Sequence, residues 1–407
     1  MKMLRLTIMA VAAIALLRIL TYILDKTSPS SAVFHRQFLF SLQLLVVLWF
    51  VVSLLLIIFK VSKSWVAGFL PILIVMLVLG VDILYSFWME NPRKIPRFLR
   101  NEFKSYYSSF ERNIIDFEPC SVYDSAYSYR LIPGLAFTFG NIEYKNNYVV
   151  NSESLRDEEE AMSGPQIVCL GNSYTLGIGA EQNATFPELI ASKTGKTVLN
   201  TANSSYGTVR ELKRLVNADT SYLEYVVIQY SKYDVYENSA FVNNRQYLRI
   251  ASDSGYRNAV RQYKWRKEYF PGKYAVTIGY DYLKGIARKI KRPKYFLSGD
   301  TDSSANYFLK VIDRYNLGPN LKIIVTEIND YNDMDSGFLQ AVDSLLQIPE
   351  FARLKGRVRT VSVSDLLIRD DYFVIDSHLR PSGHAKVADR ISYVIRQDTS
   401  AVQQQPM

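Results

Sequence analysis

Three residues that together can cleave an ester occur in two short stretches far apart in the sequence. Ser173 follows the apolar run 166–170 after one glycine and one asparagine, and Asp376 and His378 lie near the C-terminus. A serine hydroxyl becomes a strong nucleophile when a histidine removes its proton, and a carboxylate orients that histidine and stabilises its charged form. The pattern indicates nucleophilic hydrolysis with Ser173 as the nucleophile, His378 as the base and Asp376 as the orienting acid.

Few other residues could take these roles, because the sequence contains only three histidines. His35 lies between two hydrophobic segments and far from the serine, which leaves His378 as the first candidate and His384 as the second. Asp371 is the alternative carboxylate. The alternative to catalysis is structural: Ser173 could cap the helix that follows it, and His378 could be a packing residue.

The proposed serine chemistry requires neither a metal nor an organic cofactor. Cys120 and Cys169 are the only cysteines, which is too few for a disulfide framework or a cysteine-rich metal site. Cys169 stands inside the apolar run before the candidate nucleophile, so we expect a buried thiol there. The sequence therefore predicts no cofactor and leaves the redox compartment open.

Short apolar strands alternate with amphipathic helical patterns in the C-terminal part of the chain. The predicted strands are 167–170, 198–199, 225–230, 321–328 and 358–363, and the predicted helices are 186–193, 209–216 and 385–395. This alternation favours a parallel sheet with helices on both faces. Asp376 and His378 would lie on a loop at the exit of a strand, the edge where open α/β sheets bind ligands.

Three long apolar runs precede this domain, at residues 6–24, 38–59 and 65–88. Each approaches the roughly 20 residues that a helix needs to cross a bilayer. We therefore expect residues 1–90 to anchor the protein in a lipid bilayer through three transmembrane helices. Arg18 and Asp82 lie in the outer runs, close enough to an end to reach the interface. Basic residues lie at both ends of the predicted membrane segment. Charge alone therefore leaves open which end faces the cytoplasm.

The remaining segments complete the predicted domain organisation. Residues 91–150 are expected to be a basic and aromatic tether followed by a small antiparallel β element, with turns at Pro133-Gly134 and Gly140-Asn141. The main domain is expected at 151–397, followed by a polar tail at 398–407.

An insertion at about 235–300 is rich in basic and aromatic residues and carries much of the formal net charge of +9. The simplest interpretation is a solvated surface, and the alternatives are a site for an acidic glycan or for anionic lipid headgroups. The sequence has no recognised nucleic-acid-binding motif, so nucleic acid is not an expected partner.

Four blocks of the sequence resemble, in order, the SGNH (GDSL-type) hydrolase family in a membrane-anchored bacterial form. The first block is 171–177, with Asn172 where the family usually carries aspartate, and the fourth is 376–384, like the Asp-x-His-Leu-x-x-x-Gly-His form of anchored members. Residues 151–157 are similar to a stretch that often precedes this domain. Over about 151–397, the resemblance implies a flavodoxin-like three-layer sandwich with a parallel sheet, the SGNH hydrolase fold, preceded by three transmembrane helices.

The second and third blocks, 198–208 and 229–234, resemble the family's oxyanion-hole segments. The family's glycine falls on Ser205, with Gly207 as the alternative if the register shifts, and the family's asparagine falls on Tyr233. The backbone N–H of a serine can donate a hydrogen bond to the oxyanion, although glycine adopts the required turn more freely. The residues that the resemblance assigns to the oxyanion hole are Ser173, Ser205 and Tyr233, with Asn203 as a further donor.

The resemblance implies a membrane-anchored serine esterase or O-acyltransferase that acts on an acyl ester, expected to be an acylated cell-envelope carbohydrate. A transferase passes the acyl group to a sugar hydroxyl instead of water, so the motifs do not separate the two. The alternative is a catalytically degenerate SGNH domain that binds a glycan or protein partner, which Tyr233 and Ser205 favour and the intact Ser173 opposes.

The expected localisation is the bacterial inner membrane, as a multi-pass protein with the C-terminal domain outside the cytoplasm. This orientation follows from the resemblance to anchored members, because the flanking charges do not decide it. The sequence leaves the acyl group, the acceptor and the oligomeric state open.

Overall fold

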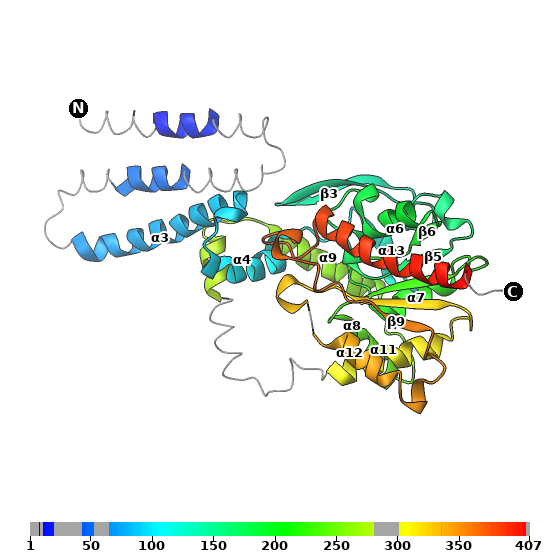
Figure 1. Ribbon diagram of the computed structural model, residues 1–407. Helices are drawn as coiled ribbons and strands as arrows, with labels where there is room; N and C mark the ends of the chain where they lie inside the picture. The colour runs from blue at the N-terminus through cyan, green and yellow to red at the C-terminus, as the bar shows by residue number, and fades with distance from the viewer. Residues whose placement is uncertain are drawn as a thin grey trace. The chain divides into compact units, whose positions relative to one another are not determined.

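The structure is a computed structural model that describes residues 8, 11–19, 43–52, 65–280, 301–334 and 336–403 (Figure 1). The chain forms two compact units. The first contains Met1–Arg112 and Lys264–Pro293, and the second contains Asn113–Tyr263 and Lys294–Met407. The end of the predicted insertion therefore groups with the N-terminal part of the chain and not with the sheet that it interrupts.

A five-stranded parallel sheet organises the second unit. Its strands are β5 (Ile167–Leu170), β6 (Val198–Asn200), β7 (Tyr225–Tyr230), β8 (Lys322–Glu327) and β9 (Val358–Thr360). They lie in the order β6-β5-β7-β8-β9, which is the flavodoxin-like order 2-1-3-4-5 when the strands of this sheet are counted from β5. The chain changes direction across the sheet between β5 and β7, so the loops that follow these two strands diverge and leave room for a ligand.

Helices cover both faces of this sheet (Figure 1). One face carries α6 (Phe186–Thr194) and α13 (Pro381–Gln403), and the other carries α7 (Thr208–Val216), α8 (Asp234–Asn243), α11 (Thr301–Tyr315) and α12 (Phe338–Leu345). Successive residues of β5 point to opposite faces, so Val168 and Leu170 enter one core while Ile167 and Cys169 enter the other. A strand buried on both sides is apolar throughout, which explains the continuous apolar run before the candidate nucleophile.

Two antiparallel hairpins precede the sheet in the second unit. The first pairs β1 (Ser121–Asp124) with β2 (Ser128–Leu131), and the second pairs β3 (Ala136–Asn141) with β4 (Tyr144–Val149). The tip of the second hairpin is thus formed by the two residues between Asn141 and Tyr144. The short helix α5 (Ser173–Leu176) follows β5, and α9 (Asp253–Lys267) follows α8. Single 3₁₀ turns lie at Glu160–Met162, Gln182–Ala184, Tyr331–Asp333, Pro349–Phe351 and Arg369–Asp371.

The first unit contains helices α3 (Trp65–Glu90) and α4 (Arg100–Tyr106), with 3₁₀ turns at Pro92–Lys94 and Arg97–Leu99 and a π-helical turn at Tyr107–Glu111. Asp82 of α3 is fully buried and accepts hydrogen bonds from the backbone N–H groups of Gly272, Tyr274 and Ala275. Lys273, in the middle of that segment, forms a buried ion pair with Glu111, with Nζ 2.7 Å from Oε1.

The prediction of three transmembrane helices is wrong. Among the helices of the described residues, none combines the length and the apolar composition that a membrane crossing requires. The first two apolar runs are described only at residues 8, 11–19 and 43–52, and their remaining residues lie outside the described part of the chain, as does His35. The predictions of a bilayer anchor and of a multi-pass inner-membrane localisation are therefore wrong as well.

The physical reason is visible in the third run, which forms α3. The second half of this helix buries Leu79, Asp82 and Tyr85 inside its own unit. The Tyr85 ring stacks on Phe103, with centroids 5.1 Å apart, and packs on Tyr274, with centroids 4.2 Å apart. Part of the apolar character that suggested a span therefore serves contacts with other residues of the protein.

Candidate functional site

Ser173 lies at the carboxyl edge of the sheet because a tight turn follows β5. A side chain at Gly171 would place its Cβ 2.0 Å from Thr175 Oγ1 and 2.8 Å from Gln229 Oε1, so only glycine fits there. Gln229 is buried on the neighbouring strand β7 and accepts a hydrogen bond from the Thr175 hydroxyl at 3.2 Å. The turn that carries the nucleophile is thus fastened to the next strand of the sheet.

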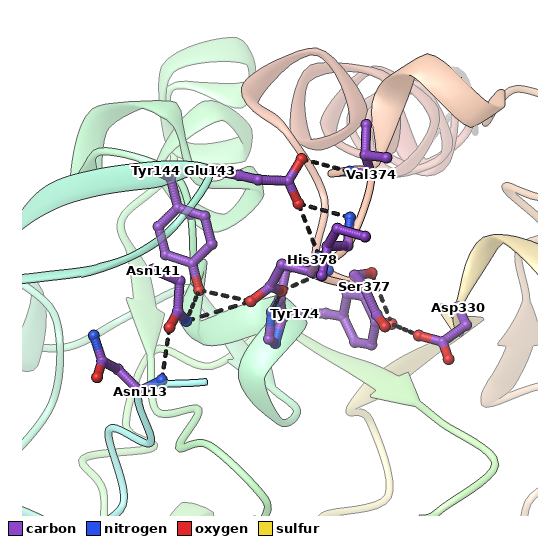
Figure 2. Close-up of polar contacts among 12 residues, drawn as sticks. Asn113, Asn141, Glu143, Tyr144, Tyr174, Asp330, Val374, Ser377 and His378 are labelled. Carbon is purple, nitrogen blue, oxygen red and sulfur yellow. Dashed lines mark hydrogen bonds and ion pairs between the residues drawn. The ribbon is translucent and has the colours of Figure 1, made fainter. Parts of the chain in front are cut away.

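The residues on either side of Ser173 connect it to the candidate base. Asn172 caps α5, because its Oδ1 accepts the Tyr174 N–H at 3.2 Å. The ring of Tyr174 lies against the ring of His378, with centroids 5.5 Å apart. The Tyr174 hydroxyl donates to the carbonyl of Ser377 at 3.2 Å and to Asp330 Oδ1 at 3.3 Å (Figure 2). The residue after the nucleophile therefore contacts the loop that carries the base.

Asp376 and His378 form a buried, hydrogen-bonded pair. His378 Nδ1 contacts Asp376 Oδ1, and the backbone N–H of His378 donates to the same oxygen at 3.1 Å. The other carboxylate oxygen, Oδ2, accepts hydrogen bonds from Asn141 Nδ2 at 3.3 Å and from the Tyr144 hydroxyl at 3.2 Å (Figure 2). Because Nδ1 faces the carboxylate, Nε2 is the ring atom available to exchange a proton with a hydroxyl.

The loop before His378 is held by Glu143, at the tip of the β3–β4 hairpin. Its carboxylate accepts the backbone N–H groups of Val374 and Ile375, both at 2.7 Å, and of Asp376 at 2.9 Å (Figure 2). Burial raises the pKa of Glu143 above the ordinary value, and the three N–H groups act against this rise. Glu143, Asn141 and Tyr144 were not among the residues expected at the site, although three polar side chains at a hairpin turn were a signal that could have indicated them.

Ser173 is partly buried and shares the sheet edge with this pair, but its hydroxyl makes no hydrogen bond to His378 in the described part of the chain. The ring of Tyr174, the residue next to Ser173, makes the contact with His378. In enzymes without substrate, the hydrogen bond between nucleophile and base is often long and shortens when substrate binds.

Ser205 adopts the left-handed backbone conformation, with φ of 57°. Few residues other than glycine adopt this conformation readily. Neither the Ser173 nor the Ser205 backbone N–H has a hydrogen-bond acceptor among the described residues. Gly207 has an ordinary φ of −106°, and a Cβ there would lie 2.8 Å from Glu237 Cβ, so packing explains this glycine.

The two other predicted oxyanion-hole residues have opposite environments. Tyr233 is 59% exposed, immediately before α8, and Lys232 Nζ lies 5.1 Å from its ring centroid. Asn203 is fully buried, and its Oδ1 accepts the N–H of Ser204 at 2.9 Å.

The structure places the two reserve residues in structural roles. His384 is fully buried, its Nδ1 accepts the N–H of Phe186 at 3.3 Å, and burial lowers its pKa to about 3. Asp371 binds Lys386 Nζ at 2.6 Å and the Ser382 hydroxyl at 2.8 Å. Burial alone would raise the pKa of Asp371, but hydrogen bonds from the backbone N–H of Ile368 and from Lys386 and Ser382 hold it below the ordinary value. His384 thus caps α6, and Asp371 fastens the start of α13.

Cys120 and Cys169 are both buried and form no disulfide. Burial raises the pKa of Cys120 to about 11 and also raises that of Cys169. The described residues contain no cluster of three or more histidine, cysteine or acidic side chains arranged to hold a metal ion.

Comparisons with known proteins add a coarse likeness. A scan of the sequence against protein-family models finds no match, and a search of curated proteins finds none either. Among solved structures, the chain is similar to a carbohydrate esterase family 2 enzyme with a carbohydrate binding domain from Corynascus thermopiles (Myceliophthora fergusii). The identity is 13%, the TM-score is 0.33, and the match covers 58% of this chain and 67% of that chain. The chemistry of the site rests on the residues of this chain.

Proposed function

We propose that this protein is a serine esterase or O-acyltransferase of the SGNH type that acts on an acylated carbohydrate. The observation that carries the proposal is the buried, hydrogen-bonded pair of Asp376 and His378 beside Tyr174, the residue directly after Ser173. A base oriented by a carboxylate next to a serine on a glycine turn is the arrangement that nucleophilic catalysis requires.

In this mechanism, Ser173 Oγ attacks the ester carbonyl carbon while His378 Nε2 takes the hydroxyl proton. Asp376 stabilises the resulting imidazolium. The carbon–oxygen bond to the alcohol then breaks, and the leaving oxygen receives the proton from His378. Water or a sugar hydroxyl next gives a proton to His378 Nε2 and attacks the acyl carbon. The bond from that carbon to Ser173 Oγ then breaks, and Oγ takes the proton back from His378. The backbone N–H groups of Ser173 and Ser205 would stabilise the oxyanion.

Exposed aromatic rings support a carbohydrate as the alcohol part of the substrate. Tyr233 and Tyr236 are 59% and 62% exposed at the start of α8. Residues three positions apart lie on the same side of a helix, so the two rings can offer neighbouring apolar faces. The C–H face of a sugar ring packs against such a surface while its hydroxyls remain in water. Tyr233 would then bind substrate and not donate to the oxyanion.

A second candidate function is binding without turnover. Two observations favour it: the family's oxyanion-hole asparagine is replaced by Tyr233, and no hydrogen bond joins Ser173 to His378 in the described residues. Losing one oxyanion donor can reduce the rate by about 100- to 1000-fold. The hydrogen-bonded Asp376 and His378 pair has no evident use in a binding module, which is why catalysis is the first proposal.

The test is labelling of the full chain with a fluorophosphonate probe, which reacts covalently with activated serines. We expect the wild-type protein to be labelled, Ser173→Ala to lose all labelling, and Ser163→Ala, which changes an exposed loop serine, to keep it. Absence of labelling in a folded wild-type protein, or retention in Ser173→Ala, would overturn the catalytic proposal in favour of binding.

Substrate class and reaction type are tested by incubating the protein with acylated sugars, with and without a free sugar acceptor. An esterase releases the free acid in both cases. A transferase forms a new acyl sugar when the acceptor is present and releases less acid. Cleavage of simple acyl esters with no preference for acyl sugars would count against the carbohydrate part of the proposal.

A further inference from the structure

The loop that presents Asp376 and His378 is shaped by a hairpin outside the sheet. The three successive N–H groups of residues 374–376 all point to the carboxylate of Glu143. The only isolated β-bridge found in the described residues near this loop joins Tyr372 to Leu379, so the residues between them form no sheet ladder. For these three N–H groups, Glu143 is the hydrogen-bond acceptor that the structure provides.

The same hairpin also completes the hydrogen bonding of the acid. Asn141, at the end of β3, and Tyr144, at the start of β4, both donate to Asp376 Oδ2. Oδ1 is left for the ring and backbone of His378. Glu143 thus holds the backbone of the loop while its two neighbours on the hairpin hold the carboxylate.

Only an anionic side chain suits three converging N–H donors. A carboxylate has two oxygens that accept hydrogen bonds in several directions, and its charge strengthens each bond. A glutamine in the same place would turn its NH₂ group toward at least one backbone N–H and leave that donor without a partner. The loop would then shift, and a displacement of about 1 Å at a reacting group can reduce a rate by roughly 100-fold.

We propose that Glu143 is a positioning residue that acts through the backbone of residues 374–376 to set the geometry of Asp376 and His378. This inference rests on the proposed function, because it concerns how the proposed base is oriented. Glu143 makes no contact with a substrate in this scheme, so its effect should appear in the rate of the covalent step and not in the binding of the probe.

Glu181 offers a matched control, because its carboxylate binds the same hairpin from a different segment. Its carboxylate accepts the side chain of Asn146 at 3.0 Å and the N–H of Asn147 at 3.2 Å, and both donors lie on β4. Glu181→Gln therefore removes a carboxylate that stabilises the hairpin but does not touch the Asp376 loop. Comparing it with Glu143→Gln separates positioning of the loop from general stability of the hairpin.

The first measurement is saturation kinetics of fluorophosphonate labelling in the full chain. We expect Glu143→Gln to lower the maximal labelling rate by about 10- to 100-fold, with the half-saturating probe concentration unchanged. Glu181→Gln should label like the wild type. Equal rates for all three proteins would overturn the inference and leave the proposed function standing, and equal slowing of both variants would show a purely structural role.

A second measurement does not depend on activity. Amide hydrogen exchange at residues 374–376 and the NMR signal of the His378 Nδ1 proton both report the loop directly. Faster exchange and loss of the signal in Glu143→Gln, but not in Glu181→Gln, would support the inference even if the wild-type protein were not labelled. Unchanged exchange and an unchanged signal in Glu143→Gln would refute it.

Discussion

Each unit of the protein contains a carboxylate that binds neighbouring backbone N–H groups of a segment far away in the sequence. In the first unit, Asp82 accepts from Gly272 at 2.7 Å, Tyr274 at 3.0 Å and Ala275 at 3.3 Å. In the second unit, Glu143 accepts in the same way from residues 374–376. In both units a buried carboxylate accepts hydrogen bonds from three backbone N–H groups, and burial raises the pKa of both carboxyl groups.

The segments that the two carboxylates hold differ in what they carry. The segment bound by Asp82 contains Lys273, whose charge is fully used in a buried ion pair with Glu111. The segment bound by Glu143 leads into Asp376 and His378, where the ring atom Nε2 is left for proton exchange. Asp82 therefore binds N–H groups at the start of a helix that begins at Lys273, whereas Glu143 binds those of a loop. The functional importance of each carboxylate depends on the side chains in the segment that it binds.

The largest effect should come from the acid itself. Replacing Asp376 by asparagine would place an NH₂ group or an uncharged oxygen against His378 Nδ1 and would disfavour the required tautomer. We expect Asp376→Asn to slow fluorophosphonate labelling by about 10,000-fold, the size of effect known for such a change in serine proteases. Asp371→Asn is the control, because Asp371 binds Lys386 and Ser382 instead. Similar labelling rates for the two variants would contradict the assigned role of Asp376.

A smaller effect is expected at the equivalent carboxylate of the first unit. Asp82→Asn would leave at least one buried N–H without an acceptor, at a cost of about 1–3 kcal/mol. Amide hydrogen exchange of Gly272, Tyr274 and Ala275 should therefore become faster, while exchange at residues 374–376 and labelling of Ser173 stay unchanged. A loss of labelling in this variant would show that the two devices are not independent.

The smallest effect concerns pH and should have the same sign in both regions. Because the pKa values of Asp82 and Glu143 are raised on folding, the folded protein binds these protons more tightly than the unfolded chain. Their contribution to stability is full below the ordinary carboxyl pKa and is lost as pH rises through the raised values. Relative to Asp82→Asn or Glu143→Gln, the wild-type free energy of unfolding should fall with rising pH in urea titrations. A difference that grows with pH would contradict this sign.

The elements of the sheet could be predicted because their signals are local. The predicted strands 167–170 and 225–230 coincide with β5 and β7, and the predicted helices 186–193 and 209–216 match α6 and α7 to within one residue. Apolar runs and helical periodicity are set by which faces of an element are buried, so they are visible in a short window. The pairing of Asp376 with His378 was equally local, because only Ser377 lies between them.

Length and apolarity were also the basis of the prediction that failed. The run 65–88 does form most of a helix, α3, but a local window does not show what covers a helix. The contacts of Asp82 and Tyr85 come from residues roughly 20 to 190 positions away, beyond any local pattern. The choice between His378 and His384 was likewise decided by distant contacts. His384 Nδ1 accepts the N–H of Phe186, whereas His378 Nδ1 contacts Asp376.

The sequence by itself determined the alternation of apolar strands with helices, the glycine turn before Ser173 and the acid and base near the C-terminus. Only the tertiary structure decided how these parts are held, because the hairpin tip at Glu143 meets the Asp376 loop across 231 to 233 residues of chain. Hydrogen bonds that a carboxylate accepts from backbone N–H groups do not depend on the side chains of the donating segment. The residue types at positions 374 and 375 therefore do not indicate the contact with Glu143. Only the folded chain brings Glu143 to this loop.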